Sequence, residues 1–188
     1  MRCGIPGKKQ PVYLGVIHRL DQPVSGLLVF AKNQRAAVAL SGQVAQRRLE
    51  KIYRAKVYAE AGAVLTENES VVLKDYMIKL PGGGARIAEP SESDAKEARL
   101  EYRCLGRQGS CALVEVNLDT GRHHQIRVQM ANAGMPLLGD AKYGSEESRR
   151  VSREMGICQI QLQAAKLSFV HPSTGKRVEY ELTEKLSI

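Results

Sequence analysis

Short apolar runs and one segment of alternating apolar and polar residues recur along this chain, separated by turn-forming residues, which is typical of strands. Tyr53, Ala55, Val57 and Ala59 alternate with polar residues, so they predict a strand with one buried face. PGGGA at 81–85 and RQGS at 107–110 have the composition of turns or flexible connections. Other strand candidates lie at 13–17, 26–31, 70–80, 97–105, 110–119, 162–170 and 176–182.

Two segments follow the helical period instead. Apolar residues between 33 and 49 recur at helical spacing, with Asn33 placed to cap the start and two arginines near the end. HHQIRVQMANAG at 123–134 predicts a short helix that Gly134 ends. Because strands outnumber helices and do not alternate with them, we expect an α+β fold around a mixed, largely antiparallel sheet. No linker or internal repeat divides the chain, so residues 1–188 are predicted to form a single domain.

The composition excludes several classes of protein. No apolar run has membrane-spanning length, and the first residues lack the apolar core of a signal peptide. Cys3, Cys104, Cys111 and Cys158 show neither the spacing of a zinc site nor the density of a disulfide scaffold. We therefore expect a cytoplasmic protein with reduced thiols and no membrane partner.

The net charge of +8 is concentrated at the front of the chain. Residues 1–60 contain eleven Lys or Arg and three acids, whereas residues 61–188 contain seventeen of each. This asymmetry favours a surface that binds a polyanion. Solvated lysines on an ordinary basic protein would give the same totals, so the charge alone does not decide between the two.

Asp21 is the first candidate for chemistry. It lies in the basic segment HRLDQP, on the connection between two predicted strands. Neighbouring cations keep a carboxylate ionised, and an ionised carboxylate can act as a nucleophile or a base. An Asx turn before Pro23 and a structural Arg–Asp pair are the alternatives.

A second cluster lies in GRHHQIRVQ at 121–129. On a helix, Arg127 would share a face with His123 and His124, which are four and three residues earlier. Adjacent histidines point about 100° apart on a helix, and no HxxxH or HExxH spacing is present, so we expect no metal site. These residues and Arg122 are interpreted as donors to phosphates or to a carboxylate, and an exposed polar helix start is the alternative.

Four ordered blocks carry a resemblance to the RluA-like family of RNA pseudouridine synthases. HRLDQPVSGLLVFAK at 18–32 is similar to the family's HRLD-x-x-TSG-L segment, and KIYRAKV at 51–57 resembles its K-x-Y-x-A-x-V strand. GRHHQIRVQMANAGMPLLGDAKYG at 121–144 and LQAAKLSFVHPSTG at 162–175 resemble two further signatures. The match spans residues 18–175, far more than one tetrapeptide.

The resemblance implies an isomerase with the pseudouridine synthase catalytic fold, in which helices flank the sheet around a central active-site cleft. Asp21 would be the nucleophile, Tyr53 the active-site tyrosine, and Arg127 the basic residue that pairs with Asp21. The reaction detaches uracil from its ribose, rotates it and rejoins it through carbon 5, which needs no metal or other cofactor. A tyrosine beside the base can stack on it and offer a phenol for the proton on carbon 5. We expect the Arg127 guanidinium to hold Asp21 through two parallel hydrogen bonds.

The implied partner is a folded ribosomal or transfer RNA from which the target uridine is extruded, and a monomer is expected. Basic residues of the first third are candidates to hold its phosphates, although a solvated basic face is the alternative. These candidates are His18, Arg19, Arg47, Arg48, Lys51 and Arg54.

Departures from the family pattern leave two other functions open. Val24 and His123 each replace a threonine of the family pattern, and Gln163 replaces a histidine. The leader before His18 is short for the family, and no accessory RNA-binding module is expected. A catalytically silent RNA-binding protein of the same fold is the main alternative. A hydrolase that uses Asp21 on another nucleic-acid or nucleoside substrate is the weaker one.

Overall fold

The computed structural model describes residues 13–61, 63–65 and 69–187. The start of the leader, including Cys3, lies outside these ranges. Within them, three helices accompany an eight-stranded sheet and a separate pair of short strands. No helix in these ranges is long and apolar enough to cross a membrane.

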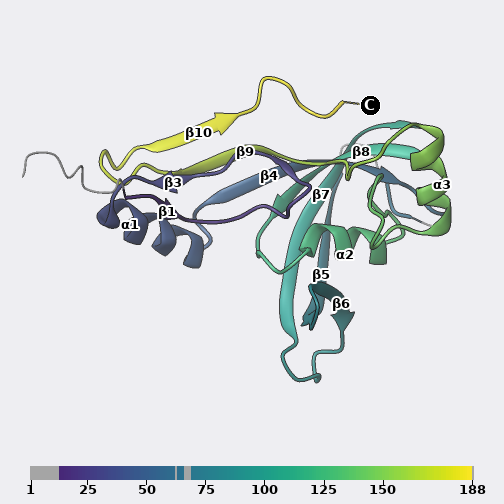
Figure 1. Cartoon of the computed structure of the whole chain (residues 1–188), viewed down its shortest axis with the longest axis horizontal. Coiled ribbons are helices and arrows are strands. Elements are labelled where there is room, and N and C mark those ends of the chain that lie inside the picture. Colours follow the sequence, from purple (N-terminus) through teal and green to yellow (C-terminus); the bar gives the residue numbers. More distant parts are fainter. Residues whose placement is uncertain (1–12, 62, 66–68, 188) are drawn as a thin grey trace, which may run out of the picture.

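The eight-stranded sheet has the order β10-β9-β4-β8-β7-β5-β6, and β2 pairs with β9 (Figure 1). The pairs along this order are antiparallel, whereas β2 runs parallel to β9, so the predicted mixed, largely antiparallel α+β fold is confirmed. The elements are β1 (Gly15–Val16), β2 (Ser25–Gly26), β3 (Phe30–Ala31), α1 (Gln34–Ala45), β4 (Glu50–Tyr58), β5 (Ser70–Leu80), β6 (Gly84–Ala88), β7 (Lys96–Gln108), β8 (Cys111–Leu118), α2 (Gln125–Asn132), α3 (Glu146–Glu154), β9 (Leu162–Val170) and β10 (Arg177–Glu181).

The centre of the core lies on β4 and its neighbours. Tyr53, Ala55 and Val57 are buried on one face of β4, as their alternation predicted. Ile126 and Met130 of α2 pack into the same cluster. Burying this apolar face fixes α2 against the sheet, so the strand that carries Tyr53 and the helix that carries Arg127 share one rigid core.

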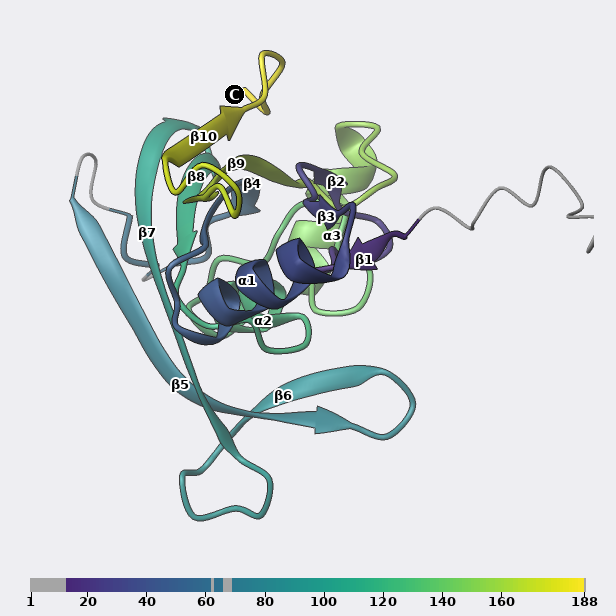
Figure 2. The same ribbon diagram turned by 90° about the vertical axis from the view of Figure 1, so that its left-hand side faces the viewer.

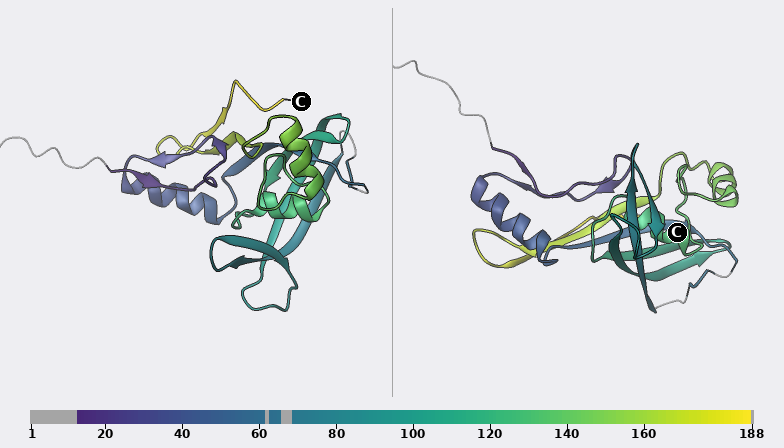
Figure 3. Two further views of the ribbon diagram at one scale, coloured as in Figure 1. Left: turned by 45° about the vertical axis from the view of Figure 1, so that its right-hand side comes forward. Right: turned by 90° about the horizontal axis from the view of Figure 1, so that it is seen from below.

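The ends of the sheet extend in different directions. Figures 2 and 3 show β5, β6 and the start of β7 projecting away from α1. The helix α2 contacts β5 and β6. At the other end, α1 packs beside β1, β3 and β9. Its start is confirmed, because the Asn33 side chain accepts a hydrogen bond from the Ala36 N–H at 2.8 Å.

Several features differ from the sequence predictions. The strand predicted at 26–31 is interrupted, because Gly26 ends β2 and β3 begins only at Phe30. Gly84 and Ala85, which were predicted to lie in a turn, begin β6. The helix α3 was not predicted, because EESRRVSRE is polar almost throughout and lacks an apolar stripe. The helix α2 begins at Gln125, two residues after its predicted start, and this changes the arrangement of the two histidines.

Candidate active site

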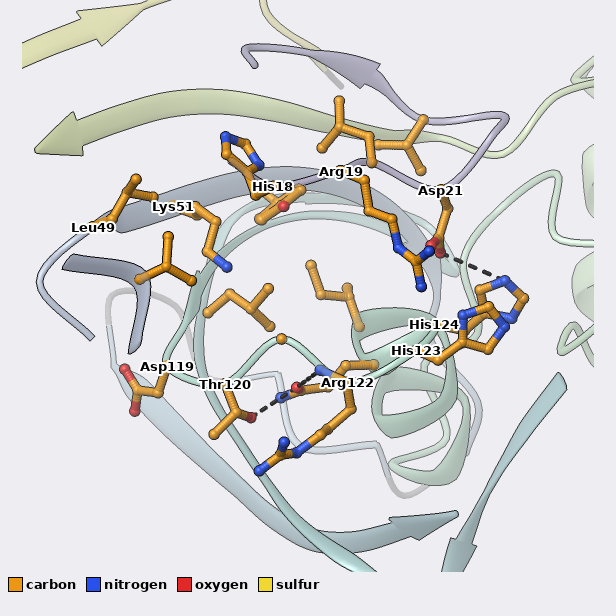
Figure 4. A pocket seen from close by; sticks show the side chains of 18 of the residues that line it. His18, Arg19, Asp21, Leu49, Lys51, Asp119, Thr120, Arg122, His123 and His124 are labelled. Atoms are coloured by element: carbon orange, nitrogen blue, oxygen red, sulfur yellow. Dashed lines mark hydrogen bonds and ion pairs between the residues drawn. The ribbon is translucent and has the colours of Figure 1, made fainter. Parts of the chain in front are cut away.

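Both clusters singled out in the sequence line one cleft of about 660 Å³ (Figure 4). Its walls come from the HRLD connection, the end of α1, the start of β4 and the segment from β8 into α2. Asp21 and the histidines lie at one end of this cleft, and Lys51 points into it from the opposite side.

Asp21 lies on a turn, where its backbone oxygen accepts a hydrogen bond from the Val24 N–H at 2.9 Å. Beyond the turn, Gly26 has φ +128°, and a Cβ there would lie 2.4 Å from the Ala164 oxygen. Only glycine permits this approach of β2 to β9. The small residues after Asp21 therefore anchor the catalytic loop to the sheet.

Arg127 faces Asp21 but is held by a different carboxylate. Its Nη1 lies 3.8 Å from Asp21 Oδ2, whereas Nε and Nη2 each lie 2.8 Å from the two oxygens of Asp140. The prediction that Arg127 holds Asp21 through two parallel hydrogen bonds is therefore wrong. The fork of the guanidinium is occupied by Asp140, and Asp21 is left with an ion-pair contact.

The Arg127–Asp140 pair is buried, with exposed fractions of 7% and 2%. Burial disfavours both charges, but their mutual hydrogen bonds outweigh it, raising the pKa of Arg127 and lowering that of Asp140. Asp140 also accepts hydrogen bonds from the N–H groups of Lys142 and Tyr143. Both residues of the pair stay charged, so a fixed cation faces Asp21.

Tyr53 is 6% exposed and lines the cleft from β4. Burial and, to a smaller extent, the charge of Asp21 raise its pKa to about 12. The phenol is therefore protonated at neutral pH. Its ring can stack on a base, and its hydroxyl is a hydrogen-bond donor in the resting site.

The two histidines are not arranged as a continuous helix would arrange them. His124 has a left-handed backbone, with φ 53° and ψ 27°, just before α2 begins. The rings of His123 and His124 consequently stack, with centroids 3.9 Å apart. The prediction that they point about 100° apart is wrong, and both lie beside Asp21 in Figure 4.

Tyr143 fixes the ring of His124. Its hydroxyl lies 2.7 Å from His124 Nδ1 and accepts a hydrogen bond from the Ala85 N–H at 3.0 Å. His124 Nε2 then faces Asp21 Oδ2 at 3.9 Å. Burial lowers the pKa of His124 despite the opposing charge of Asp21, so the neutral imidazole is favoured. The Arg127 guanidinium also stacks over the Tyr143 ring, 4.9 Å from its centroid.

A buried network holds the turn before α2. Thr120 donates to the Gln125 side chain at 2.7 Å, and Gln125 donates to Gln129 at 2.9 Å. The Arg122 N–H also donates to the Gln125 side chain. The Nε of Arg122 donates to the Glu97 backbone oxygen at 2.8 Å. Arg122 lines the cleft, but part of its guanidinium serves to tie this turn to β7.

The remaining candidate RNA contacts divide into two groups. The cleft is lined by His18, Arg19, Arg47 and Lys51. Arg48 and Arg54 are not among its lining residues. Arg54 follows Tyr53 on β4 and therefore points to the opposite face, where Nη1 donates to the Leu186 oxygen at 3.3 Å. The structure thus separates Arg48 and Arg54 from the other basic candidates.

Two residues of the site were missed in the sequence interpretation. Asp140 and Tyr143 position Arg127 and His124, yet they lie thirteen or more residues downstream of these partners. Their signal was the segment GDAKYG at 139–144, which belongs to the third family block. The block was recognised, but no role was assigned to these two side chains.

Comparisons with known proteins agree with this geometry. The family model for RNA pseudouridylate synthase matches residues 6–132. The chain is 37% identical over 180 residues to an uncharacterized RNA pseudouridine synthase of Chloroflexus aurantiacus, covering 94% of this chain and 51% of that one. It is 33% identical to ribosomal large subunit pseudouridine synthase D of Zymomonas mobilis, covering 95% and 54%.

The fold is also found in a solved human structure. Human RNA pseudouridylate synthase domain containing 1 superposes with a TM-score of 0.74 at 24% identity, covering 92% of this chain and 69% of that one. The chain spans about half the length of the curated relatives it matches. The resemblance found in the sequence is confirmed, and the chain belongs to the RNA pseudouridylate synthase family.

Proposed function

We propose that this chain is an RNA pseudouridine synthase that acts as a cytoplasmic monomer on one uridine of a folded ribosomal or transfer RNA, with Asp21 as nucleophile. One observation carries the proposal. The Asp21 carboxylate faces the guanidinium of Arg127 at 3.8 Å in a cleft that Tyr53 also lines. An RNA-binding protein without activity has no need of a carboxylate among these phosphate-binding groups.

The arrangement suits the reaction at each step. Asp21, kept beside a fixed cation, supplies the anionic nucleophile for detaching uracil from its ribose. Because the Asp140 carboxylate neutralises Arg127, the cation orients Asp21 without a tight hydrogen bond that would lower its reactivity. The freed base then turns within the cleft and is rejoined through carbon 5.

Tyr53 is assigned the role of contacting the uracil base during the reaction. Its ring offers a stacking surface that keeps the detached uracil in the cleft while it turns. Its neutral phenol can take the proton from carbon 5 only if it passes its own proton on. Asp21, whose negative charge contributes to the high pKa of Tyr53, is assigned as the acceptor of that proton once the carboxylate has been released from the ribose.

The basic residues that line the cleft are assigned to binding the phosphates of the RNA backbone. Arg19 lies beside Asp21, and Lys51 points into the cleft from the opposite side. Arg47 also lines the cleft. Extruding a base from folded RNA costs a few kcal/mol, which phosphate contacts around the cleft can offset. The relative named above as a ribosomal large subunit pseudouridine synthase makes ribosomal RNA the first substrate to test.

The test is the substitution Asp21→Asn. It keeps the shape of the side chain and removes the nucleophile, so release of tritium from uridine labelled at carbon 5 should fall to background while RNA binding stays within about twofold. Asp94→Asn is the matched control. Asp94 is exposed on a turn with φ 65°, a conformation that Asn tolerates, and it lies outside the cleft.

The outcomes separate the candidate functions. Wild-type release by Asp21→Asn would remove this residue from the mechanism. A wild-type chain that binds RNA tightly yet forms no pseudouridine in any RNA fraction would instead be a silent binding protein. Mapping pseudouridine in cellular RNA with and without the gene identifies the target.

A further inference from the structure

Asp21, His123 and His124 form a cluster in which the two histidines have no assigned part in the synthase reaction. One ligand atom from each, a carboxylate oxygen or a ring nitrogen, lies within 4.8 Å of the others. His123 stands where the family pattern has threonine, so the third ligand is a departure from that pattern. Two imidazoles and one carboxylate are ligands that zinc and similar divalent metals prefer.

The charges around the cluster are mixed. Arg127 faces Asp21 at 3.8 Å, but the two oxygens of Asp140 neutralise it. Arg19 beside Asp21, and Lys142, whose charge acts on His124, oppose a metal ion. A dication at this cluster must therefore gain more from the Asp21 carboxylate and two imidazoles than it loses to these two cations.

Each imidazole also has a feature expected of a ligand. His124 Nδ1 is bonded to the Tyr143 hydroxyl at 2.7 Å, which leaves Nε2 free toward Asp21. A hydrogen bond to the other ring nitrogen is the usual support of a metal-bound histidine. His123 Nε2 is buried and has no hydrogen-bond partner within the described part of the chain, and a metal would supply one.

The adjustment needed is small for Asp21 and His124 and larger for His123, because the ligand atoms of the cluster lie up to 4.8 Å apart. Ligands about 2.0–2.2 Å from a tetrahedral ion lie roughly 3.4 Å from one another. His124 Nε2 and Asp21 Oδ2 are 3.9 Å apart, so they must approach by about half an ångström. The stacked ring of His123 must rotate further, because an ion lies in the plane of each imidazole that binds it. Rotation about the side-chain bonds of a half-buried histidine permits this.

We propose that this cluster binds one divalent transition-metal ion of the zinc type through Asp21, His123 and His124, and that the bound ion blocks the catalytic carboxylate. Three protein ligands leave a fourth position for water. Since the ion occupies the oxygen that must act as nucleophile, metal and reactive RNA exclude each other. The metal is thus a reversible inhibitor and takes no part in the reaction.

Binding is measured first, on the whole chain and without any RNA. Zinc is titrated by calorimetry into the wild type, His123→Thr and the control His171→Thr, which removes a histidine from the turn after β9. Loss of a direct ligand should weaken binding at least as much as loss of a supporting partner does, about 10–100-fold. His123→Thr should therefore bind at least tenfold more weakly, while His171→Thr should match the wild type.

Cobalt(II) replaces zinc in a second measurement that identifies the ligands. The exposed thiol of Cys158 is a competing site, and a thiolate ligand gives a charge-transfer absorption that imidazole and carboxylate ligands do not. The expected spectrum lacks this absorption and loses its visible bands in His123→Thr. A thiolate spectrum, or equal zinc affinity in wild type and His123→Thr, would overturn the proposal.

Inhibition is the third measurement and depends on the proposed function. Pseudouridine formation is followed against zinc concentration, with each protein normalised to its own rate in chelator. The wild type should be inhibited at the zinc concentration that fills the site, and His123→Thr should need at least about tenfold more, in line with its weaker binding. Saturation of the site without inhibition would overturn the blocking role. An inactive chain would instead contradict the proposed function and leave the binding result standing.

Discussion

Arg127 donates two hydrogen bonds of 2.8 Å to Asp140 and presents its remaining terminal nitrogen to Asp21 at 3.8 Å. The two carboxylates therefore have different tasks. Asp140 fixes the plane of the guanidinium, and Asp21 faces the terminal nitrogen that Asp140 leaves free. Asp140 is a positioning residue, because it acts on the reaction only through Arg127.

Asp140→Asn tests this division. The amide cannot accept both hydrogen bonds from the guanidinium and carries no charge, so Arg127 is left as an uncompensated buried cation. Breaking a buried ion pair in this way should lower the free energy of unfolding by about 3 kcal/mol. Single-turnover rates at saturating RNA should also fall, because the cation that faces Asp21 loses its fixed orientation. Chemical denaturation and rapid-quench assays measure the two effects.

Asp119→Asn is the matched control for Asp140→Asn. Asp119 lines the same cleft and pairs with Arg99, but both side chains are partly exposed. Its loss should cost no more than about 1 kcal/mol. If Asp140→Asn lowered stability and the folded protein still turned over at the wild-type rate, the pair would be structural only.

Arg127→Lys keeps the positive charge and removes the planar guanidinium group. A lysine ammonium cannot bond both oxygens of Asp140 and face Asp21 at the same time. A misplacement of about 1 Å at a catalytic group can cost roughly a hundredfold in rate, and a loss of this size is expected in single-turnover assays. RNA affinity should change little. A lysine variant with the wild-type rate would show that only the charge matters.

Strand alternation predicted the framework well, because burial of one face leaves a clear period of two. The β4 residues Tyr53 and Val57 are buried as predicted, and Tyr53 lines the cleft. The helix α3 left no such signal, since its buried residues are Ser148 and Ser152 and its polar surface has no apolar stripe.

Most members of the site could be predicted from the sequence, but Asp140, Tyr143 and the pairing of Arg127 could not. The family resemblance brought Asp21 and Arg127 together, but which carboxylate binds the Nε and Nη2 of Arg127 depends on how the segment after α2 folds back. Gly139, with φ 75°, packs against the Gln159 backbone there, where a Cβ would lie 2.1 Å from its oxygen, and so places Asp140 beside α2. The stacking of the histidines depends on the backbone of a single residue, His124, which periodicity does not reveal.

Tyr53→Phe separates stacking from hydroxyl chemistry. Phenylalanine keeps the aromatic surface and loses the phenol, so RNA affinity should persist while pseudouridine formation falls sharply. Because the pKa of Tyr53 is raised to about 12, the working group is the neutral phenol. The wild-type rate should accordingly stay nearly constant between pH 7 and pH 9. A tenfold rise per pH unit in this window would mean that the phenolate is the active form.

His18 should make the stability of the chain sensitive to mild acid. Burial and, secondarily, the charge of Lys51 lower the pKa of His18 from 6.5 to about 4. Its Nε2 accepts a hydrogen bond from the Val29 N–H at 3.4 Å, which a protonated ring cannot do. The unfolded chain therefore binds the proton more readily, and stability should fall as the pH is lowered from 6.5 toward 4.

The contribution of His18 is isolated by comparison with His18→Gln. Other groups titrate in the same window, so the difference between the two denaturation series is the relevant quantity. The wild type should lose more stability than the variant between pH 6.5 and pH 4. Parallel series would show that His18 takes up its proton in the folded state as easily as in the unfolded chain.

The last prediction concerns RNA affinity and the basic residues that line the cleft. Its control removes the same number of charges from outside the cleft. Arg47 and Lys51 line the cleft, whereas the neighbouring Arg48 and Arg54 do not. Burial lowers the pKa of Lys51, and an RNA phosphate beside it would favour the charged ammonium. We therefore expect phosphates at Arg47 and Lys51.

Arg47→Gln with Lys51→Gln should weaken binding across RNA sequences, because phosphate contacts carry no sequence information. Each lost contact should reduce the slope of log affinity against log salt by roughly 0.7–0.9. Arg48→Gln with Arg54→Gln removes the same two charges from outside the cleft and should leave this slope close to that of the wild type. Filter binding across a series of salt concentrations measures both. If the two double variants flattened the slope equally, the RNA would respond to the overall charge of the chain, and the cleft would have no special share in holding its backbone.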